Sequence, residues 1–422
     1  MFALLLPTAY SYCLLPTAYC LLPTDFVRKF WEQLAIATNW PVLAAVLVLA
    51  LTGVVSIWGD DPVEGKKQLV FLFIGIGCMI AFQAVNYQHL GRFAWGFYLL
   101  AILLVLYTVV GTIVRVPFVK PINGASNWIS LPGFSVQPSE LVKLGFCAVM
   151  ARYLRYRTSY RTLPGLIGPF ALCLVPVLFI LKQPDLGTAL TFIPALFVML
   201  FVAGARTKHL AGIVGVGLLF APILWFAGTC KVPTCTVCAR VPVLKALPQV
   251  VKHYQRERVY AMSSDDPAIR QGVGYQQHHA VMAFGSGGAT GKGMGNIPVG
   301  KYVPEAHNDM VFALVGEQFG FWGVAVVLGA YFALFTAGIE IAASTREPFG
   351  KLLAVGVITL MAGQAFLNIM VCLRIFPVTG VTLPFVSYGG SSLIASFMTA
   401  GLLLNIGQNR PIVMANDSFE YD

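Results

Sequence analysis

Long runs of hydrophobic residues recur along the chain and are separated by mostly short polar segments. A helical run of about 20 residues crosses the hydrocarbon core of a bilayer, where only helices and closed barrels satisfy every backbone polar group. The pattern therefore predicts an all-α polytopic membrane protein with about ten transmembrane helices. The expected spans are residues 38–58, 68–86, 94–114, 138–156, 163–182, 187–205, 209–228, 309–342, 350–373 and 387–407.

Two of these spans are unusual. Residues 138–156 contain the charged residues Glu140, Lys143 and Arg152, and they count as a span partly because the topology requires one there. Residues 309–342 form a run long enough for its helix to project beyond the bilayer.

Composition and charge agree with a membrane protein. Of the 422 residues 57% are hydrophobic and 11% are charged, whereas soluble domains average about 25% charged. The net charge of +10 comes from basic residues between spans, so nucleic acid binding is not expected. Short loops rich in Lys and Arg stay in the cytoplasm, which predicts cytoplasmic termini and a large external loop at 229–308, between helices seven and eight. Some of these cations can also meet lipid phosphate groups. The loop cations are Arg92, Arg155, Arg157, Arg161, Arg206, Lys208, Arg346 and Lys351.

Outside the spans the chain has two distinct ends. Residues 1–37 combine a low-complexity extension, in which LLPTAY occurs twice, with a short interfacial segment, and residues 409–422 form a cytoplasmic tail. The transmembrane domain occupies residues 38–408. In the external loop, Cys230, Cys235 and Cys238 have no second pair that would complete a zinc site, which favours a disulfide with one thiol left over.

The external loop carries two adjacent carboxylates, Asp265 and Asp266, directly before Pro267. A carboxylate at a membrane surface can act as a general base or hold a divalent cation, and repulsion from its neighbour suits a base. The same pattern also occurs in ordinary turns and helix caps. Both interpretations stay open from the residues alone.

A glycine-rich stretch, GSGGATGKG, follows at residues 285–293. A Walker A loop is excluded because Ser286 stands at its first glycine position and Gly293 follows Lys292 in place of Ser or Thr. No nucleotide site is therefore expected. Two explanations remain: a backbone nest for a diphosphate with Lys292 as a point charge, or glycines that serve the folding of the loop.

Several ionisable residues fall at membrane depth, where a charge is costly and indicates function by default. Glu140 and Lys143 are three residues apart, so they share a helix face and can pair. Lys182 and Asp185 flank a KQPD turn, and Glu317 lies inside the eighth span. Ion pairs that only lock helices together are the alternative explanation.

Four separated motifs together resemble the SEDS family of cell-wall polymerases. They read NGASNWISL…QPSELVK, KQPDLGTAL, YQRERV…DDP…GYQ…GSGG…GKG…VPEAHNDMVFALVGEQFGFWG and FPVTGVTLPFVSYGGSS, and the resemblance covers about residues 38–410. The last motif, with VNYQHL after the second span, is more similar to the RodA-like branch of the family than to the FtsW-like branch.

The resemblance implies an inverting peptidoglycan glycosyltransferase. Such a protein polymerises lipid II into β-1,4 glycan strands at the outer face of the bacterial cytoplasmic membrane during cell elongation, beside a class B penicillin-binding protein. Asp266 matches the essential aspartate and would be the general base, with undecaprenyl diphosphate as the leaving group. A Mg²⁺ or Mn²⁺ ion is expected, with Asp265 or Asp266 as a candidate ligand. The residues expected to bind the substrate or its diphosphate are Lys292, Arg256, Arg258, Glu140, Lys143, Lys182, Asp185, Ser387, Gly389 and Gly390.

The sequence departs from the family pattern in three places. Asn127 stands where an arginine commonly precedes tryptophan, residues 229–250 look like an insertion, and residues 308–310 read NDM in place of TDF. None of these changes removes Asp266. Two other functions remain as alternatives: a lipid II flippase or other transporter, and a non-catalytic activator of a penicillin-binding protein.

Overall fold

The structure is a computed structural model that describes residues 39–112, 114, 116–119, 127–131, 134–183, 185–229, 253–263, 271–272 and 274–409, without the side chains of 221–229, 253–256 and 263. Asp265, Asp266, the three loop cysteines, the N-terminal extension and the tail from residue 410 lie outside the described residues. The predictions about them are untouched by the structure.

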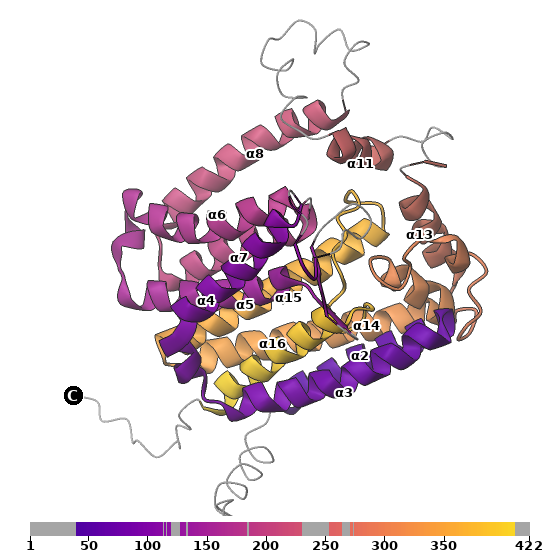
Figure 1. Cartoon of the computed structure of the whole chain (residues 1–422), viewed down its shortest axis with the longest axis horizontal. Coiled ribbons are helices and arrows are strands. Elements are labelled where there is room, and N and C mark those ends of the chain that lie inside the picture. Colours follow the sequence, from indigo (N-terminus) through magenta and orange to yellow (C-terminus); the bar gives the residue numbers. More distant parts are fainter. Residues whose placement is uncertain are drawn as a thin grey trace, which may run out of the picture. The chain divides into compact units, whose positions relative to one another are not determined.

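The described chain is mostly helical, and each of the ten predicted spans contains a helix (Figure 1). Eight of the described helices are long and apolar enough to cross a membrane, which confirms the fold class. The helices are α2 (Trp40–Asp60), α3 (Pro62–Ala84), α4 (Tyr87–Val110), α5 (Pro138–Tyr156), α6 (Ile167–Lys182), α7 (Leu186–Ala203), α8 (Thr207–Thr229), α11 (His253–Ser263), α13 (Tyr275–Ser286), α14 (Val311–Ser344), α15 (Pro348–Cys372) and α16 (Gly390–Gln408), with 3₁₀ turns at Ser159–Arg161, Pro164–Leu166 and Gly300–Tyr302.

Capping residues set helix starts that the hydrophobic pattern missed. Helix α3 begins at Pro62, six residues before the predicted start, because the Asp61 side chain accepts the backbone N–H of Val63. Helix α4 begins at Tyr87 because Asn86 accepts the N–H of Gln88. Hydropathy alone did not predict either start, because the first turns of both helices contain polar residues.

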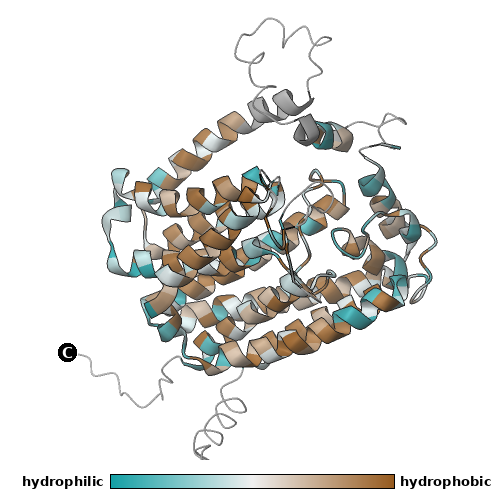
Figure 2. Cartoon of the chain, in the orientation of Figure 1, coloured by the Kyte–Doolittle hydropathy of each residue, from teal (hydrophilic) through white to brown (hydrophobic). Residues whose placement is uncertain are grey.

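Helix α5 is the polar span, and it lies inside the helix bundle. It packs against α4, α15, α7 and α6, and most of its residues are buried (Figure 1). Burial by protein on several sides explains its low hydropathy, because lipid does not have to solvate its charged residues. Hydrophilic residues elsewhere gather at the helix ends and in the loops (Figure 2).

Helix α14 is broken, which corrects the prediction of one continuous long span. Gly320 has φ 63° and ψ −156°, so the helix stops and restarts there. The break leaves the carbonyls of Glu317 and Gln318 without their helical donors, and the N–H groups of Lys292 and Gly293 donate to them at 3.0 Å each. In return, the N–H groups of Phe321 and Trp322 donate to carbonyls of the glycine-rich loop.

A short hairpin completes the part of the fold that matters for the site. Strands β1 (Ile129–Leu131) and β2 (Phe134–Val136) pair antiparallel, with Ile129 opposite Val136. The hairpin leads directly into α5, where the backbone N–H of Gln137 donates to the Ser391 hydroxyl at 3.0 Å. This bond ties the start of α5 to the first turn of α16.

Candidate functional site

A cavity of about 700 Å³ lies where several helices begin. Its volume falls in the range of about 300–1,000 Å³ that small-molecule sites occupy. Its walls come from the first turns of α3 and α16, the hairpin, the residue before α7, helix α11 and the segment before α14. The lining residues are Lys67, Phe71, Asn127, Trp128, Phe134, Ser135, Gln137, Asp185, Arg258, Glu305, Asn308, Asp309, Thr379, Gly380, Thr382, Tyr388, Gly389, Gly390 and Ser392.

Positive charge enters the cavity from two side chains and a helix end. Arg258 on α11 donates through Nη1 to the Val378 carbonyl at 2.9 Å, which holds the helix against the cavity wall. Lys67 on α3 pairs with Glu64 at 2.9 Å and is half exposed. Helix α16 begins at Gly390 with no side-chain cap, so its first N–H groups add partial positive charge. Together these groups can bind an anion such as a diphosphate.

Glycine is required where the cavity meets α16. Gly389 has φ 150°, a conformation that other residues rarely adopt, and a Cβ on Gly390 would come within 2.7 Å of the Phe71 ring. The amide of Gln68 fixes this turn, since it donates to the Ser387 carbonyl and accepts the Gly389 N–H. The two glycines therefore bring the backbone of the turn to the cavity surface.

Carboxylates face the same cavity. Asp185 is buried and caps α7, accepting the Thr188 N–H at 3.0 Å, and burial raises its pKa. Burial, together with the charges of Asp185 and Glu305, raises the pKa of Asp309 from 3.8 to about 6, although the Arg258 charge opposes the rise. Asp309 can therefore exchange a proton near neutral pH.

The buried pair predicted on α5 is formed, away from this cavity. Lys143 Nζ lies 2.8 Å from Glu140 Oε2 and 2.6 Å from the Gln364 side-chain oxygen on α15. The pair lines a separate space of about 30 Å³, which is room for a water molecule and too small for a sugar. This geometry fits helix locking, and a direct role in substrate binding stays a prediction.

The glycine-rich loop folds against the broken helix α14. Its N–H groups at Gly291, Lys292 and Gly293 all donate to protein carbonyls, so they are not available to a diphosphate. Lys292 Nζ lies 2.8 Å from Glu317, a carboxylate with no exposed surface, and 2.6 Å from the Ser286 hydroxyl. Of the two explanations for these glycines, the structure supports loop folding, and Lys292 does not line the cavity.

The other predicted site residues lie in different settings. Lys182 is exposed at the end of α6, and Ser387 is buried, where its hydroxyl accepts the Leu383 N–H. The side chain of Arg256 lies outside the described residues, as do Asp265 and Asp266. The cavity therefore gathers Arg258, Asp185, Gly389 and Gly390 from the predicted set, and the roles of the others stay predictions.

Most lining residues were not among the predicted binding residues, and three of these bear directly on the charge and polarity of the cavity. Asp309, Lys67 and Tyr388 lie at helix starts or turns, and each belongs to a polar cluster at the edge of a hydrophobic run. Asp309 could have been found from sequence, because it occupies the aspartate position of the NDM segment that was compared with TDF. No hydropathy signal marks Lys67, which the pattern placed just outside its span.

The expected divalent cation is not tested by these residues. Within the described ranges, no group of three or more His, Cys, Asp or Glu side chains could hold a metal ion. The two aspartates proposed as ligands lie outside those ranges.

These features define a polytopic helical membrane protein with a charged cavity at one end of its helices. The chain belongs to the FtsW/RodA/SpoVE family, whose model, described as a cell cycle protein, matches residues 30–411.

Relatives and solved structures agree with that assignment. A probable peptidoglycan glycosyltransferase FtsW from Trichlorobacter lovleyi is 33% identical, over 87% of this chain and 93% of the relative. A structure described as a peptidoglycan synthase complex that coordinates polymerization and crosslinking matches with TM-score 0.71 at 30% identity, over 89% of this chain and 99% of the other. The rod shape-determining protein RodA of Thermus thermophilus matches with TM-score 0.62 at 28% identity, over 89% and 98%.

Proposed function

We propose that the chain is a peptidoglycan glycosyltransferase that polymerises lipid II into β-1,4 glycan strands at the outer face of the bacterial cytoplasmic membrane. The observation that carries the proposal is the 700 Å³ cavity, in which Arg258 and the uncapped start of α16 face Asp185 and Asp309. Cations suit a lipid diphosphate, and carboxylates suit the hydroxyl groups of a sugar. The enzyme activity named for the FtsW relative supports this assignment.

The proposed reaction is a displacement at the anomeric carbon of one lipid II molecule. The 4-hydroxyl oxygen of the acceptor sugar attacks that carbon, its proton passes to the Asp266 carboxylate, and the bond to undecaprenyl diphosphate breaks. The configuration inverts, which gives the β linkage. Helix α11 carries Arg258 at the cavity and ends three residues before Asp266 in the chain, which supports this assignment of the base.

Cations would stabilise the leaving diphosphate. Arg258 and Lys67 are the described cations situated for this, because both line the cavity, whereas Lys292 is paired with Glu317. A Mg²⁺ or Mn²⁺ ion held by Asp265 or Asp266 would add positive charge at the same step. The energy comes from the activated donor, so the reaction requires no nucleotide.

Topology supports an external site. The cavity lies at the start of α5, and loop arginines gather at the opposite end of this helix. Arg155, in the last turn of α5, is 17 residues after Pro138, which corresponds to about 25 Å along the helix. Since basic loops remain in the cytoplasm, the cavity opens toward the outside and both chain ends lie inside.

We further propose a role in cell elongation with a class B penicillin-binding protein as partner. The RodA-like form of the last motif and the match to a rod shape-determining protein support elongation, while the FtsW relative is named for a different branch. The match to a synthase complex supports a crosslinking partner.

Polymerisation of lipid II by the purified full chain tests the proposal. With Mg²⁺ and the partner present, the parent protein and Glu340→Ala should form glycan chains, since Glu340 is an exposed carboxylate near the other end of α14. Asp266→Ala should form none. Chains from Asp266→Ala would remove that residue from the mechanism. Chains from no variant, with lipid II crossing vesicle membranes, would favour a transporter.

A further inference from the structure

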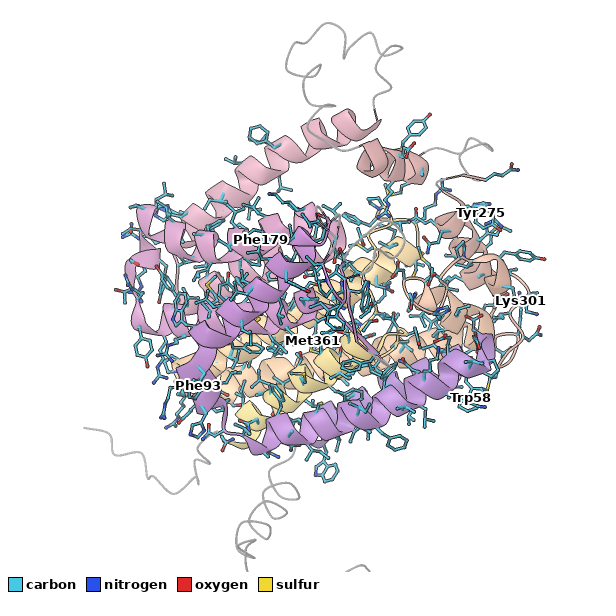
Figure 3. The ribbon with its side chains drawn as sticks, in the orientation of Figure 1. Trp58, Phe93, Phe179, Tyr275, Lys301 and Met361 are labelled. Atoms are coloured by element: carbon cyan, nitrogen blue, oxygen red, sulfur yellow. The ribbon has the colours of Figure 1, made fainter. Side chains whose placement is uncertain are left out.

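A second cavity, of about 230 Å³, lies at the opposite end of α5 from the candidate active site. Three arginines line it: Arg92 from the first turns of α4, and Arg152 and Arg155 from the end of α5. Phe93, which follows Arg92, lies at the other end of the helices from Trp58 and Lys301 (Figure 3). We call it the arginine pocket, and its remaining lining residues are Gln88, Gly91, Tyr156 and Phe349.

The charges in the arginine pocket are not balanced. Arg155 lies 2.8 Å from Glu347, a carboxylate that also caps α15 by accepting the Gly350 N–H. Arg152 donates to the neutral Gly91 carbonyl, and Arg92 makes no hydrogen bond or ion pair with another described residue. Three cations and one carboxylate leave a net charge of about +2 in a concave space. This arrangement favours an anion, such as a phosphate, that can accept two hydrogen bonds from one guanidinium group.

Two of the three guanidinium groups are held in place. Arg155 and Arg152 lie 5.2 and 6.0 Å from the centre of the Tyr156 ring, and each has a second contact, with Glu347 or with the Gly91 carbonyl. Side chains fixed in this way lose little conformational entropy when they bind a ligand. The pocket is therefore preformed rather than a scatter of mobile surface charges.

Exposed aromatic residues surround the arginines and indicate where the anion comes from. Phe93 and Tyr156 are each 68% exposed and Trp95 is 43% exposed, although all three are large and partly apolar. Aromatic residues in this position are typical of the level of lipid head groups. This position suits an anion attached to a lipid, because its acyl chains could cover the aromatic surface beside the pocket.

We propose that the arginine pocket binds the phosphate of an anionic phospholipid head group, in the leaflet opposite the candidate active site. The inference is independent of the glycosyltransferase reaction. The proposal assigns a function to these particular arginines, whereas the rule that basic loops stay in the cytoplasm accounts only for the overall excess of positive charge on that side. A bound lipid would bridge α4, α5 and α15, because the pocket is lined by residues of all three helices.

Native mass spectrometry of the full chain in detergent tests this proposal, with phosphatidylglycerol or phosphatidylcholine added at equal concentration. The parent protein should retain more phosphatidylglycerol than phosphatidylcholine. Arg92→Gln should weaken that binding about fivefold, the loss expected for one basic side chain near an anionic lipid, and should leave phosphatidylcholine binding unchanged. Arg92 has no hydrogen-bond or ion-pair partner to lose among the described residues, so this variant should fold as the parent does.

Arg206→Gln is the matched control, because Arg206 is exposed, precedes α8 and does not line the pocket. It should bind phosphatidylglycerol as the parent does. An equal loss in Arg206→Gln, or no loss in Arg92→Gln, would overturn the proposal. Displacement of the lipid by millimolar inorganic phosphate would overturn the lipid source, since the pocket would then take a soluble anion.

Discussion

The pair of Lys292 and Glu317 allows a structural role to be separated from a catalytic one. Glu317 has no exposed surface, and its oxygens accept the N–H groups of Val299 at 3.0 Å and Gly300 at 2.7 Å in addition to the Lys292 ammonium group. Lys292→Met leaves a buried carboxylate without its cation. Breaking such a pair costs about 3–5 kcal/mol, and the two backbone donors that remain put the expected loss near the lower end, about 3 kcal/mol.

The assay is denaturant unfolding of the purified protein, followed by the polymerisation rate of each variant. Lys292→Met with Glu317→Gln should recover part of the lost stability, because the neutral amide needs no cation, although its single oxygen can accept only one of the two backbone N–H groups. For the unfolding measurement alone, Lys67→Met is the control, since its pair with Glu64 is half exposed and should contribute less than about 0.5 kcal/mol.

Activity decides between the two roles of Lys292. With a purely structural role, the double variant regains the rate together with the stability. If the double variant recovers stability yet stays inactive, Lys292 acts on the diphosphate, and the argument from its pairing is refuted. Unchanged stability in Lys292→Met alone would also refute it.

Two further predictions concern the cavity and the helix break. The pKa of Asp309 is raised from 3.8 to about 6, so its contribution to stability is present below about pH 4 and is lost as the pH rises through 6. Asp309→Asn should therefore be more stable than the parent at pH 7.5, by up to about 2 kcal/mol after allowance for partial exposure, and equal to it near pH 4, as measured by unfolding at both pH values. Gly320→Ala should lose more than about 2 kcal/mol, because its φ is 63° and its Cβ would lie 2.3 Å from the Gly291 nitrogen. Gly329→Ala, in open space on the same helix, should be neutral or slightly stabilising in the same unfolding measurement.

Hydropathy was sufficient to locate a helix in each predicted span, because lipid solvates most of these helices directly. It was least informative for α5, whose charged residues Glu140 and Lys143 satisfy each other among neighbouring helices. The break in α14 could not be predicted, since its apolar pattern continues across Gly320. The partners that make the break possible lie 27 or more residues earlier in the chain, in the glycine-rich loop.

The candidate site was predictable where a motif residue also begins or caps a helix. Asp185 caps α7 and Gly390 begins α16, and both reach the cavity as expected from the motifs. Lys292 shows the limit of such reasoning, because its charge suggested a diphosphate and its nearest carboxylate is 25 residues away in sequence. Asp309 shows the converse, because only the fold buries its carboxyl group and brings Asp185 close to it, and both raise the pKa of Asp309.

The rate of glycan formation by Asp266→Asn tests the central claim most directly. The variant keeps the shape of the side chain and removes its ability to take the proton from the acceptor hydroxyl. With matched unfolding midpoints and the partner present, it should polymerise lipid II at least about 100-fold more slowly than the parent. A rate close to that of the parent would contradict the assignment of Asp266 as the base in a glycosyltransferase reaction.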